Sequence, residues 1–597
     1  MPEYKAPLRD FRFVFNELLE FEKHYASIPG GEDLNAEMID AIIGEAGKIA
    51  EEVIAPINRS GDEEGCTWSP EGVTTPKGFK AAYDQYYQAG IGSMSHREAY
   101  GGQGLPPSLG MSISEMMAAA NNSFSMYPGL TNGAMAAIDA HGTEEHKHTY
   151  LPKMNSGEWS GTMCLTEAHC GTDLGLLRTK AVPADDGSFD ITGEKIFISA
   201  GDHDLAKNIV HLVLARLPDA PAGTKGISLF IVPKFLPNAD GNAGDENAVK
   251  CASIEHKMGI KASATCVMTF EDSKGFMIGL PNKGLRAMFT MMNVARIGTG
   301  TQGMAQGAAS YQGALTYARE RLQMRALTGP KFPDKPADPI IVHPDVRRML
   351  LTQKAFAEGS RAFVAYLGKM TDLLLRKEGT DEADRAEKML ELLTPICKGF
   401  MTDTGFESAN HGMQVLGGHG FISEWGMEQL VRDGRILQQY EGANGIQALD
   451  LIGRKVLANG GATLREFTDE IEAFCKDAAG IDGMEPFTSA LQLHVMEWHS
   501  LVQEILQRAL KNPDEAGGAS YDFLSYSGYV VYAYLFARAA AIALPKQGGE
   551  GAEAGFYKAK VFTARFFFER LLPRTRGLVA TMASSSDNLM DLDEALL

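Results

Sequence analysis

The stretch QQYEGANGIQALDLIGRKV, residues 438–456, places a carboxylate, Glu441, between a tyrosine and a glycine. Apolar residues then recur at spacings of three, three and four, which predicts a helix: Ile446, Leu449, Ile452 and Val456. Two interpretations are open. Glu441 is either an ordinary solvated acid near a helix start, or a base directed into a pocket. The choice depends on what surrounds this stretch in the rest of the chain.

Length, composition and charge limit the classes of protein to consider. The 597 residues predict three or four domains, and 44% hydrophobic with 22% charged residues is typical of globular protein. The net charge of −20 disfavours nucleic-acid binding, which needs a basic face, and adhesion to anionic membranes. Seven scattered cysteines without a CxxC pair argue against a disulfide framework or a zinc site.

No segment reads as a targeting or membrane-spanning sequence. The opening MPEYKAPLRDFRFVF carries acids and a proline and lacks the apolar run of a signal peptide. The longest apolar stretch, 527–544, contains Arg538, which favours a buried or surface-docked helix over a membrane span. We therefore expect a soluble, cytoplasmic protein.

The pattern of apolar residues divides the chain into five regions. We predict an N-terminal arm over 1–35 and a helical domain over 36–160. The β-rich runs 208–217, 226–235 and 263–272 predict a small antiparallel sheet or barrel over 161–275. Helical patterns return over 280–457 and again over 465–597, where Trp498, Leu501, Val502 and Ile505 mark one helix face. The expected fold is mainly α with a central β domain and an appended C-terminal helical domain.

One motif has the form of a dinucleotide-binding fingerprint but lacks its sequence context. RIGTGTQG contains G-x-G-x-x-G at Gly298, Gly300 and Gly303, but a dinucleotide fingerprint must follow a strand and open a helix. The preceding MFTMMNVA is not strand-like, and the chain lacks the alternating βα pattern of that fold. We predict a helix whose small-residue face allows close packing.

Five sequence stretches are informative when they are taken together and in their order along the chain. MCLTEAHCGTDLG (163–175) ends the first helical block, and KIFISAG (195–201), YARERLQM (317–324), QVLGGHGF (414–421) and YEGANGIQ (440–447) follow. Together they resemble the acyl-CoA dehydrogenase family over about residues 36–456. The flanks and the C-terminal extension resemble its branch of about 600 residues, which holds bacterial long-chain acyl-CoA dehydrogenases and 3-methylmercaptopropionyl-CoA dehydrogenases.

The resemblance implies an architecture and a cofactor. The family has a helical domain, a β-barrel and a helical bundle, with FAD between barrel and bundle and its adenosine half reaching a second subunit of a homodimer. Carried over to this sequence, the FAD contacts would be Met163, Leu165, Thr166, Gly171, Thr172, Phe197, Ser199, Arg321, Met324, Gln414, Gly417, Gly418, Ala443 and Gly445. No metal site is implied.

Each motif also has a plain structural interpretation, and some depart from the family pattern. Alone, they could be a Gly-rich turn, a strand with one aromatic, a solvated helix face and a helix C-cap. Ala168 replaces a usual proline, Phe197 a tryptophan over the flavin, and Met324 a common phenylalanine. Ala443 stands where a threonine often bonds the flavin, and losing one such bond costs about 1 kcal/mol.

The resemblance gives Glu441 a role. It would be the base that removes the α-proton of an acyl-CoA thioester while hydride leaves Cβ for flavin N5, which requires a partly desolvated carboxylate. Its own backbone N–H and a ribityl hydroxyl would bind the thioester oxygen. The substrate contacts would be Thr172, Asn293, Arg296, Tyr440 and Gly442, although Arg296 could equally be a surface arginine.

Several functions remain open at this stage. The leading hypothesis is dehydrogenation of a straight medium- or long-chain acyl-CoA to a trans-2-enoyl-CoA in β-oxidation, with an electron-transferring flavoprotein as acceptor. The alternative substrate is 3-methylmercaptopropionyl-CoA, from dimethylsulfoniopropionate breakdown. An acyl-CoA oxidase shares the fold, and a catalytically silent flavoprotein scaffold is the alternative of another class, suggested by the basic aromatic segment 556–574.

Overall fold

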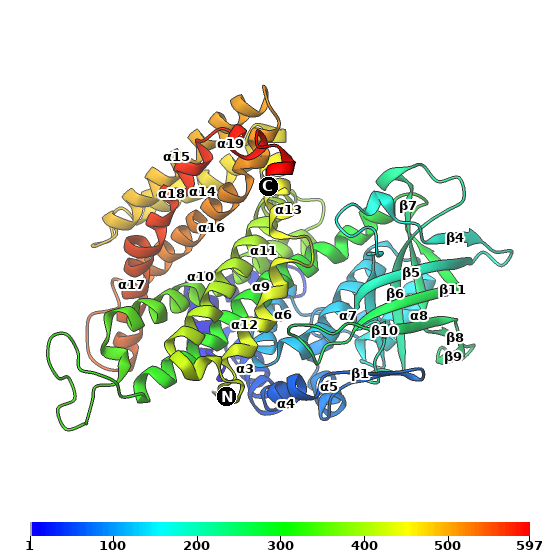
Figure 1. The fold of residues 1–597 in the computed structure, drawn as a ribbon, viewed down its shortest axis with the longest axis horizontal. Helices are drawn as coiled ribbons and strands as arrows, with labels where there is room; N and C mark the ends of the chain where they lie inside the picture. Colours follow the sequence, from blue (N-terminus) through cyan, green and yellow to red (C-terminus); the bar gives the residue numbers. More distant parts are fainter. Residues whose placement is uncertain (1–2) are drawn as a thin grey trace. The chain divides into compact units, whose positions relative to one another are not determined.

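The computed structural model describes residues 3–597 and divides into two compact units, each described here by itself. Of the described residues, one unit holds 45–298, and the other holds 3–44 together with 299–597. The order helical, β, helical, helical that the sequence predicts is confirmed along the chain (Figure 1).

The unit of residues 45–298 contains a β-barrel. Its strands are β3 (Trp159–Cys164), β4 (Lys180–Pro183), β5 (Phe189–Ser199), β6 (Asn208–Arg216), β7 (Ile227–Pro233), β10 (Val249–Ile254) and β11 (Thr265–Ile278). The pairing runs β10-β11-β5-β4-β6-β3, and β7 pairs with both β11 and β6. Because β7 joins the two ends of the path from β11 to β6, those strands form a closed ring, which removes exposed edges.

The expectation of a small antiparallel sheet or barrel is wrong in one respect, because two strand pairs are parallel. Strand β3 pairs with β6 in parallel, and β4 meets β6 in parallel at a single pair, Lys180 with Arg216. Parallel neighbours need a long crossover, and the connection from β3 to β6 includes the 165–179 loop and two other strands. Local alternation of side chains cannot reveal a pairing between strands so far apart in sequence.

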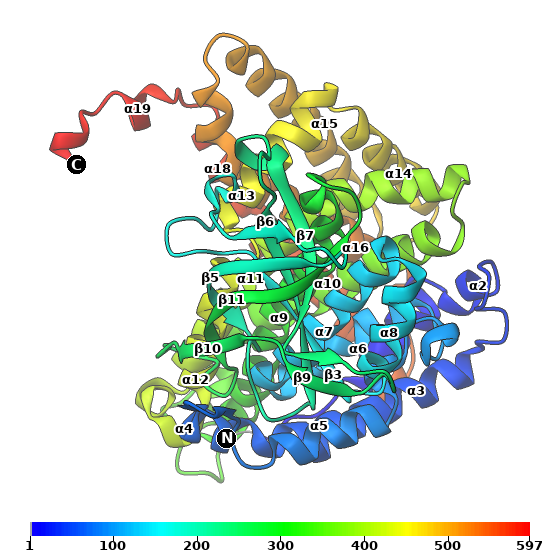
Figure 2. The ribbon, with the colours of Figure 1, turned by 90° about the vertical axis from the view of Figure 1, so that its right-hand side faces the viewer.

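Two apolar cores fix the barrel strands. In β6, Val210, Leu212 and Leu214 belong to one core, while Val213 and Ala215 belong to the other, as the two-residue period of a strand requires. Helices α7 (Asn122–His141) and α8 (Glu144–Asn155) pack into the first core and lie beside the sheet in Figure 2. The same unit also contains α4 (Asn58–Glu64), α5 (Phe79–Gln88), α6 (Pro107–Ala120) and the hairpin β1 (Thr67–Ser69) to β2 (Gly72–Thr74).

The second unit is helical. Its long helices are the later part of α9 (Gly284–Glu320), α10 (Pro344–Arg376), α11 (Asp381–Val415) and α16 (Asp514–Ala543). Shorter ones are α1 (Leu8–Arg12), α2 (Phe21–Tyr25), most of α3 (Ala36–Lys48), α12 (Met427–Arg435), α13 (Asn444–Leu449), α14 (Ala462–Ala478), α15 (Glu485–Ala509), α17 (Ala552–Phe566), α18 (Thr575–Met582) and α19 (Asp587–Met590). The predicted face of α15, Trp498, Leu501, Val502 and Ile505, is buried.

The G-x-G-x-x-G motif lies inside helix α9, as predicted. A Cβ on Gly303 would approach the Met401 carbonyl oxygen and the Thr402 Cα on α11 to 2.8 Å, and one on Gly300 would lie 2.9 Å from the Cys397 carbonyl oxygen. These glycines therefore let two helices approach closely, and the motif lies within a helix instead of at the strand-to-helix turn of a dinucleotide fingerprint.

Helix α16 crosses α10 and α11 in the same way. A Cβ on Gly359 would lie 2.5 Å from the Tyr532 ring, and one on Gly399 would lie 2.7 Å from a Leu524 methyl group. Gly528 itself faces the ring of Phe400. The apolar stretch 527–544 is thus the core helix that the sequence analysis favours, and its side chains pack against the bundle.

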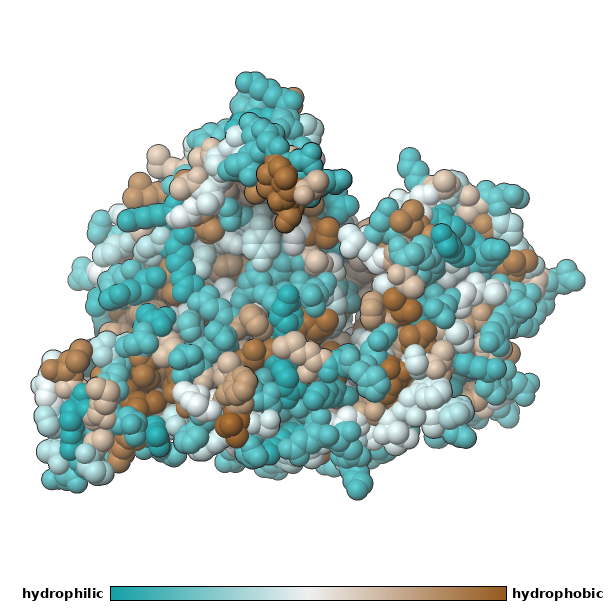
Figure 3. Space-filling model, viewed as in Figure 1, coloured by the Kyte–Doolittle hydropathy of each residue, from teal (hydrophilic) through white to brown (hydrophobic). Residues whose placement is uncertain are grey.

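No described helix is long and apolar enough to cross a membrane. On the face drawn in Figure 3, brown apolar atoms gather near the chain's C-terminal end. That end holds five exposed apolar residues: Leu589, Met590, Leu592, Leu596 and Leu597. These five residues follow α16, whose stretch Ser527–Ala537 is buried.

Candidate functional site

Glu441 lies in a tight turn, two residues before the N-cap of α13. Its φ is +57°, and that of Gly442 is +83°. A left-handed conformation costs a non-glycine residue roughly 1–2 kcal/mol, and such strain persists only where the surroundings impose it. The surrounding residues therefore impose the backbone conformation of this turn, which differs from that of an ordinary helix start.

Gln447 holds this turn. Its buried side-chain amide donates to the carbonyl oxygens of Glu441, at 3.0 Å, and Gly442, at 3.4 Å. A Cβ on Gly442 would lie 2.6 Å from the same amide nitrogen. Gly442 is thus required both for its left-handed φ and for the space that Gln447 fills.

Tyr440 lies beside the carboxylate and stays neutral. Its hydroxyl donates to Gln302 Oε1 at 2.6 Å. Burial, and then the negative charge of Glu441, raise the pKa of the Tyr440 hydroxyl well above its usual value. A phenol in that state cannot act as a base near neutral pH, so Glu441 is the proton acceptor that this turn offers.

The helical run after the base is confirmed in part. Ile452 and Val456 are fully buried, but Leu449 is 47% exposed. The chain changes from α13 to a π-helical segment at Asp450–Val456, which shifts the buried face by widening the turn. Ala443 is the N-cap of α13 and makes no side-chain cap bond.

The LTEAHCGTD stretch lies in the other unit and follows a strand, not a helical block as expected. Met163 and Cys164 end β3, and the loop begins at Leu165. Leu165 is buried, Thr166 and Met163 are half-buried, and Gly171 and Thr172 are exposed. Sequence reasoning did not anticipate what fixes the loop.

A buried ion pair fixes it. The Glu167 carboxylate accepts from Lys195 Nζ at 2.9 Å and from the Thr179 hydroxyl at 2.6 Å, and Lys195 also donates to the Leu165 carbonyl. Burial alone would raise the pKa of Glu167, but the charge of Lys195 and the Thr179 hydrogen bond outweigh it and lower the pKa to about 2. The sequence offered a partial signal, because the first motif contains the acids Glu167 and Asp173 and the second contains a single base, Lys195.

This loop also contains three potential metal ligands. Atoms of Glu167, His169 and Cys170 lie within 4.8 Å of one another. The carboxylate oxygen facing Lys195 already accepts its bonds, and the other accepts from the Arg178 backbone N–H at 2.7 Å. A cation there would have to compete with the Lys195 ammonium, so the cluster is arranged for an ion pair.

The KIFIS stretch presents an aromatic ring to solvent. Phe197, on β5, is 59% exposed and has a φ of +59°. Ser199, two residues on, is half-buried. An exposed ring on a strained backbone is unusual for a strand, and it is suited to stacking on a flat ligand.

The residues expected at the adenosine end of FAD are exposed. Arg321 follows the end of α9, and Met324, 77% exposed, has a φ of +61°. Gln414 lies in the last turn of α11, and the exposed glycines Gly417 and Gly418 begin the short helix that follows it. These surfaces remain open to a ligand or a second chain.

The two residues expected near the acyl-CoA channel lie in the first part of α9. Asn293 is exposed, whereas Arg296 is buried. The alternative interpretation of Arg296 as a surface arginine is therefore wrong. A buried guanidinium is costly unless it is paired, which points to a structural or binding role.

Family comparison covers almost the whole chain. Residues 37–158, 162–273 and 282–457 match the acyl-CoA dehydrogenase N-terminal, middle and C-terminal domains, and residues 467–593 match an acetyl-CoA dehydrogenase C-terminal-like domain. The chain belongs to the acyl-CoA dehydrogenase family. The resemblance inferred from the five motifs is confirmed, including the presence of a fourth, appended region.

Some relatives within the family match over nearly the full length of the chain. The chain is 40% identical to 3-methylmercaptopropionyl-CoA dehydrogenase of Ruegeria pomeroyi, over 98% of this chain and 99% of the relative. It is 36% identical to a butyryl-CoA dehydrogenase of Syntrophomonas wolfei, over 99% of this chain and 98% of the relative. It is 34% identical to the broad-specificity linear acyl-CoA dehydrogenase FadE5 of Mycobacterium tuberculosis, over all of both chains.

Solved structures share the fold. Caenorhabditis elegans ACDH-11 in complex with C11-CoA has a TM-score of 0.77 at 16% identity, over 96% of this chain and 95% of that one. A Bacillus anthracis acyl-CoA dehydrogenase complexed with FAD has a TM-score of 0.72 at 20% identity, over 95% of this chain and 91% of that one. At these identities the likeness concerns the fold alone, and it extends through the appended helices.

Proposed function

We propose that this protein oxidises an acyl-CoA thioester to the trans-2-enoyl-CoA, with FAD as cofactor and Glu441 as the base that takes the α-proton. The observation that carries the proposal is the turn of Glu441: a carboxylate on a left-handed backbone, held by Gln447 beside a neutral tyrosine. Strained backbone and a positioned carboxylate are features of a reacting group.

The residues present fit FAD. Phe197 offers an exposed aromatic face, and Thr166 and Ser199 offer hydroxyls on the same unit. Membership of the family and the FAD complex of the Bacillus anthracis enzyme support the assignment. When bound, FAD supplies the acceptor for the hydride that leaves Cβ.

The chain's own part in the reaction is proton transfer and charge stabilisation. The half-buried Glu441 carboxylate accepts the α-proton, and its backbone N–H donates to the thioester oxygen as negative charge develops there. Gln447 keeps both groups of this one residue in place by bonding its carbonyl oxygen. Electrons then leave to an electron-transferring flavoprotein, and we propose a homodimer as the working form.

Two substrates compete within this proposal. The likeness to FadE5 and to butyryl-CoA dehydrogenase supports straight acyl chains, and the 40% identity to the Ruegeria enzyme supports 3-methylmercaptopropionyl-CoA. Anaerobic reduction by a panel of acyl-CoAs, including the methylthio compound, would rank them by the bleaching rate of the flavin band.

The decisive variant is Glu441→Gln, which keeps the size of the side chain and removes its basicity. We expect FAD content and thermal midpoint to be retained, while flavin bleaching by acyl-CoA slows by roughly 10²–10⁴-fold. Unchanged bleaching would place the base elsewhere, and fast reoxidation of the reduced enzyme by air in stopped flow would favour an oxidase.

A further inference from the structure

Both flanks of the proposed base meet at one carboxylate, Asp403 on α11. Gln438, three residues before Glu441, donates its amide to Asp403 Oδ1 at 2.7 Å. Asn444, three residues after Glu441, donates to the same oxygen, also at 2.7 Å. The seven-residue segment that contains the base therefore has both ends tied to a single acceptor.

Asn444 is held from several sides. It is buried at the start of α13, and its amide also donates to Thr402 Oγ1 at 3.0 Å and the Gly399 carbonyl at 3.1 Å. Its own oxygen accepts from the buried Lys398 ammonium at 2.8 Å. Asn444 can thus occupy one position only, and α11 supplies every one of these partners.

The second oxygen of Asp403 is bound by the appended C-terminal region. Tyr521, on α16, donates its hydroxyl to Asp403 Oδ2 at 2.5 Å. Burial and the negative charge of Asp403 raise the pKa of Tyr521, so the phenol remains protonated and continues to donate near neutral pH. A short bond to a charged acceptor is stronger and more directional than a neutral one.

We propose that the appended region positions the base: Tyr521 fixes the rotation of the Asp403 carboxylate, and Asp403 fixes both ends of the Glu441 turn. Tyr521 and Asp403 are positioning residues, since they act through Gln438 and Asn444. The inference rests on the proposed function of Glu441 and gives the C-terminal helices a part in it.

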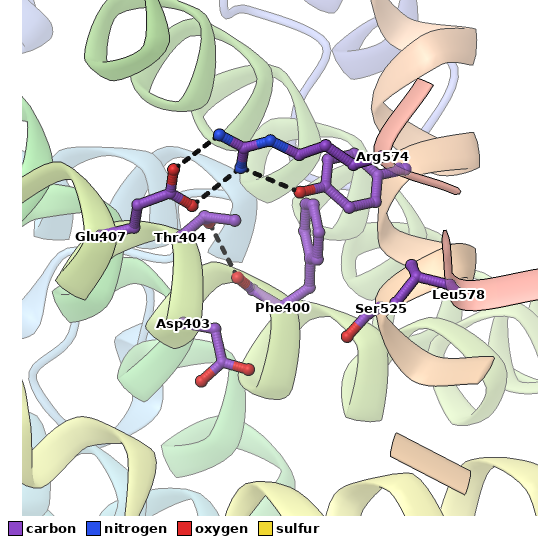
Figure 4. Close-up of a pocket in the computed structure, with 8 residues that line it drawn as sticks. Phe400, Asp403, Thr404, Glu407, Ser525, Arg574 and Leu578 are labelled. Carbon is purple, nitrogen blue, oxygen red and sulfur yellow. Dashed lines mark hydrogen bonds and ion pairs between the residues drawn. The ribbon is translucent and has the colours of Figure 1, made fainter. Parts of the chain in front are cut away.

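The same faces of α11 and α16 supply a control. One turn after Asp403, Glu407 forms a two-point ion pair with Arg574, at 2.8 and 2.9 Å, and Arg574 also donates to the Tyr529 hydroxyl at 3.2 Å. Figure 4 shows this pair above Asp403 around a cavity of about 290 Å³. Tyr529 therefore joins the same two elements without reaching the turn of Glu441.

The test compares Tyr521→Phe with Tyr529→Phe, each of which removes one hydroxyl from α16. For Tyr521→Phe we expect the limiting rate of anaerobic flavin reduction by acyl-CoA to fall about tenfold, because small misplacements of a reacting group have large effects on rate. We expect KM, FAD content and thermal midpoint to stay near those of the native enzyme. Tyr529→Phe should keep the native rate.

A double-mutant cycle separates positioning from general stability. In an Asp403→Asn background, which we expect to be slowed about 100-fold, the further change Tyr521→Phe should have no effect, because the two residues act as one unit. Independent, multiplying effects, or a native rate for Tyr521→Phe, would overturn the proposal. If Asp403→Asn does not fold, the Tyr521→Phe comparison still decides.

These variants distinguish failure of the positioning role from failure of the proposed function of Glu441. Loss of flavin reduction in Glu441→Gln together with a native rate in Tyr521→Phe would reject the positioning role alone. Retained turnover in Glu441→Gln would reject the base, whatever the tyrosine variants do.

Discussion

At the scale of single residues, left-handed backbone outside glycine coincides with several of the residues expected to act. Glu441, Phe197 and Met324 all have φ near +60°. Only a glycine adopts this conformation without cost, so each must be imposed by its surroundings. For Glu441 the cause is visible in Gln447, whose amide closes the turn. A sequence pattern cannot reveal such a conformation, because the cause lies six residues away and depends on a buried side chain.

The buried pair of Glu167 and Lys195 leads to a prediction about stability and pH. Glu167→Gln would leave the fully buried Lys195 ammonium without its anionic partner. Breaking a buried pair costs about 3–5 kcal/mol, so we expect the midpoint of denaturant unfolding near neutral pH to fall accordingly. Glu63→Gln, which breaks only an exposed pair with Arg59, should cost under about 1 kcal/mol.

The sign of the pH dependence follows from the direction of the shift. The pKa of Glu167 is lowered from 4.5 to about 2 in the folded chain, so its stabilising effect is complete above pH 4.5 and is lost as the pH falls toward 2. The difference in unfolding free energy between native protein and Glu167→Gln should therefore shrink over that window. A difference that stays constant from pH 6 to pH 3 would contradict the assignment.

At the scale of elements, the sequence predicts most of what is local. The β runs, the buried face of α15 and the small-residue face of α9 follow from apolar spacing and glycine placement, and all three are confirmed. The parallel pairing of β3 with β6 was missed because it joins strands separated by the whole 165–207 segment. The link from Asp403 to Asn444 was missed for the same reason, since it connects residues 41 positions apart.

Helix α16 allows two glycines of opposite character to be compared. Gly528 faces the Phe400 ring, whereas a Cβ on Gly517 would meet nothing within 4 Å. Gly528→Ala should therefore destabilise the protein by about 1–3 kcal/mol through overpacking. Gly517→Ala should stabilise it by about 0.5–1 kcal/mol through helix propensity. Thermal midpoints check both, and equal shifts in one direction would show that α16 does not pack on α11 as described.

At the scale of the whole molecule, the first described residues, from residue 3 on, belong to the same compact unit as the last helices. Phe11, Phe13 and Phe15 are buried, and His24 contacts the buried Asp372 at 3.0 Å. The segment predicted as an arm is therefore built into that unit. A local sequence pattern could suggest that this segment is distinct from the helical domain that follows it. It could not reveal the residues, hundreds of positions later, that the segment packs against.

Asp10 is the anion that links the N-terminal segment to α10 and α17. It contacts both the Arg361 guanidinium and the Lys560 ammonium, and these two cations outweigh burial and lower its pKa. Asp10→Asn would remove the anion that the largely buried Arg361 and Lys560 share. Among the described residues, Lys560 would then keep only Glu358, at 3.0 Å, so we expect a loss of about 3–5 kcal/mol and faster proteolysis within the first 25 residues. Asp40→Asn, which breaks an exposed pair with Arg12 at 2.5 Å, should cost under about 1 kcal/mol and leave the proteolysis pattern unchanged. If both variants behave alike, the N-terminal segment is held by its buried aromatic residues, and the ion cluster contributes little.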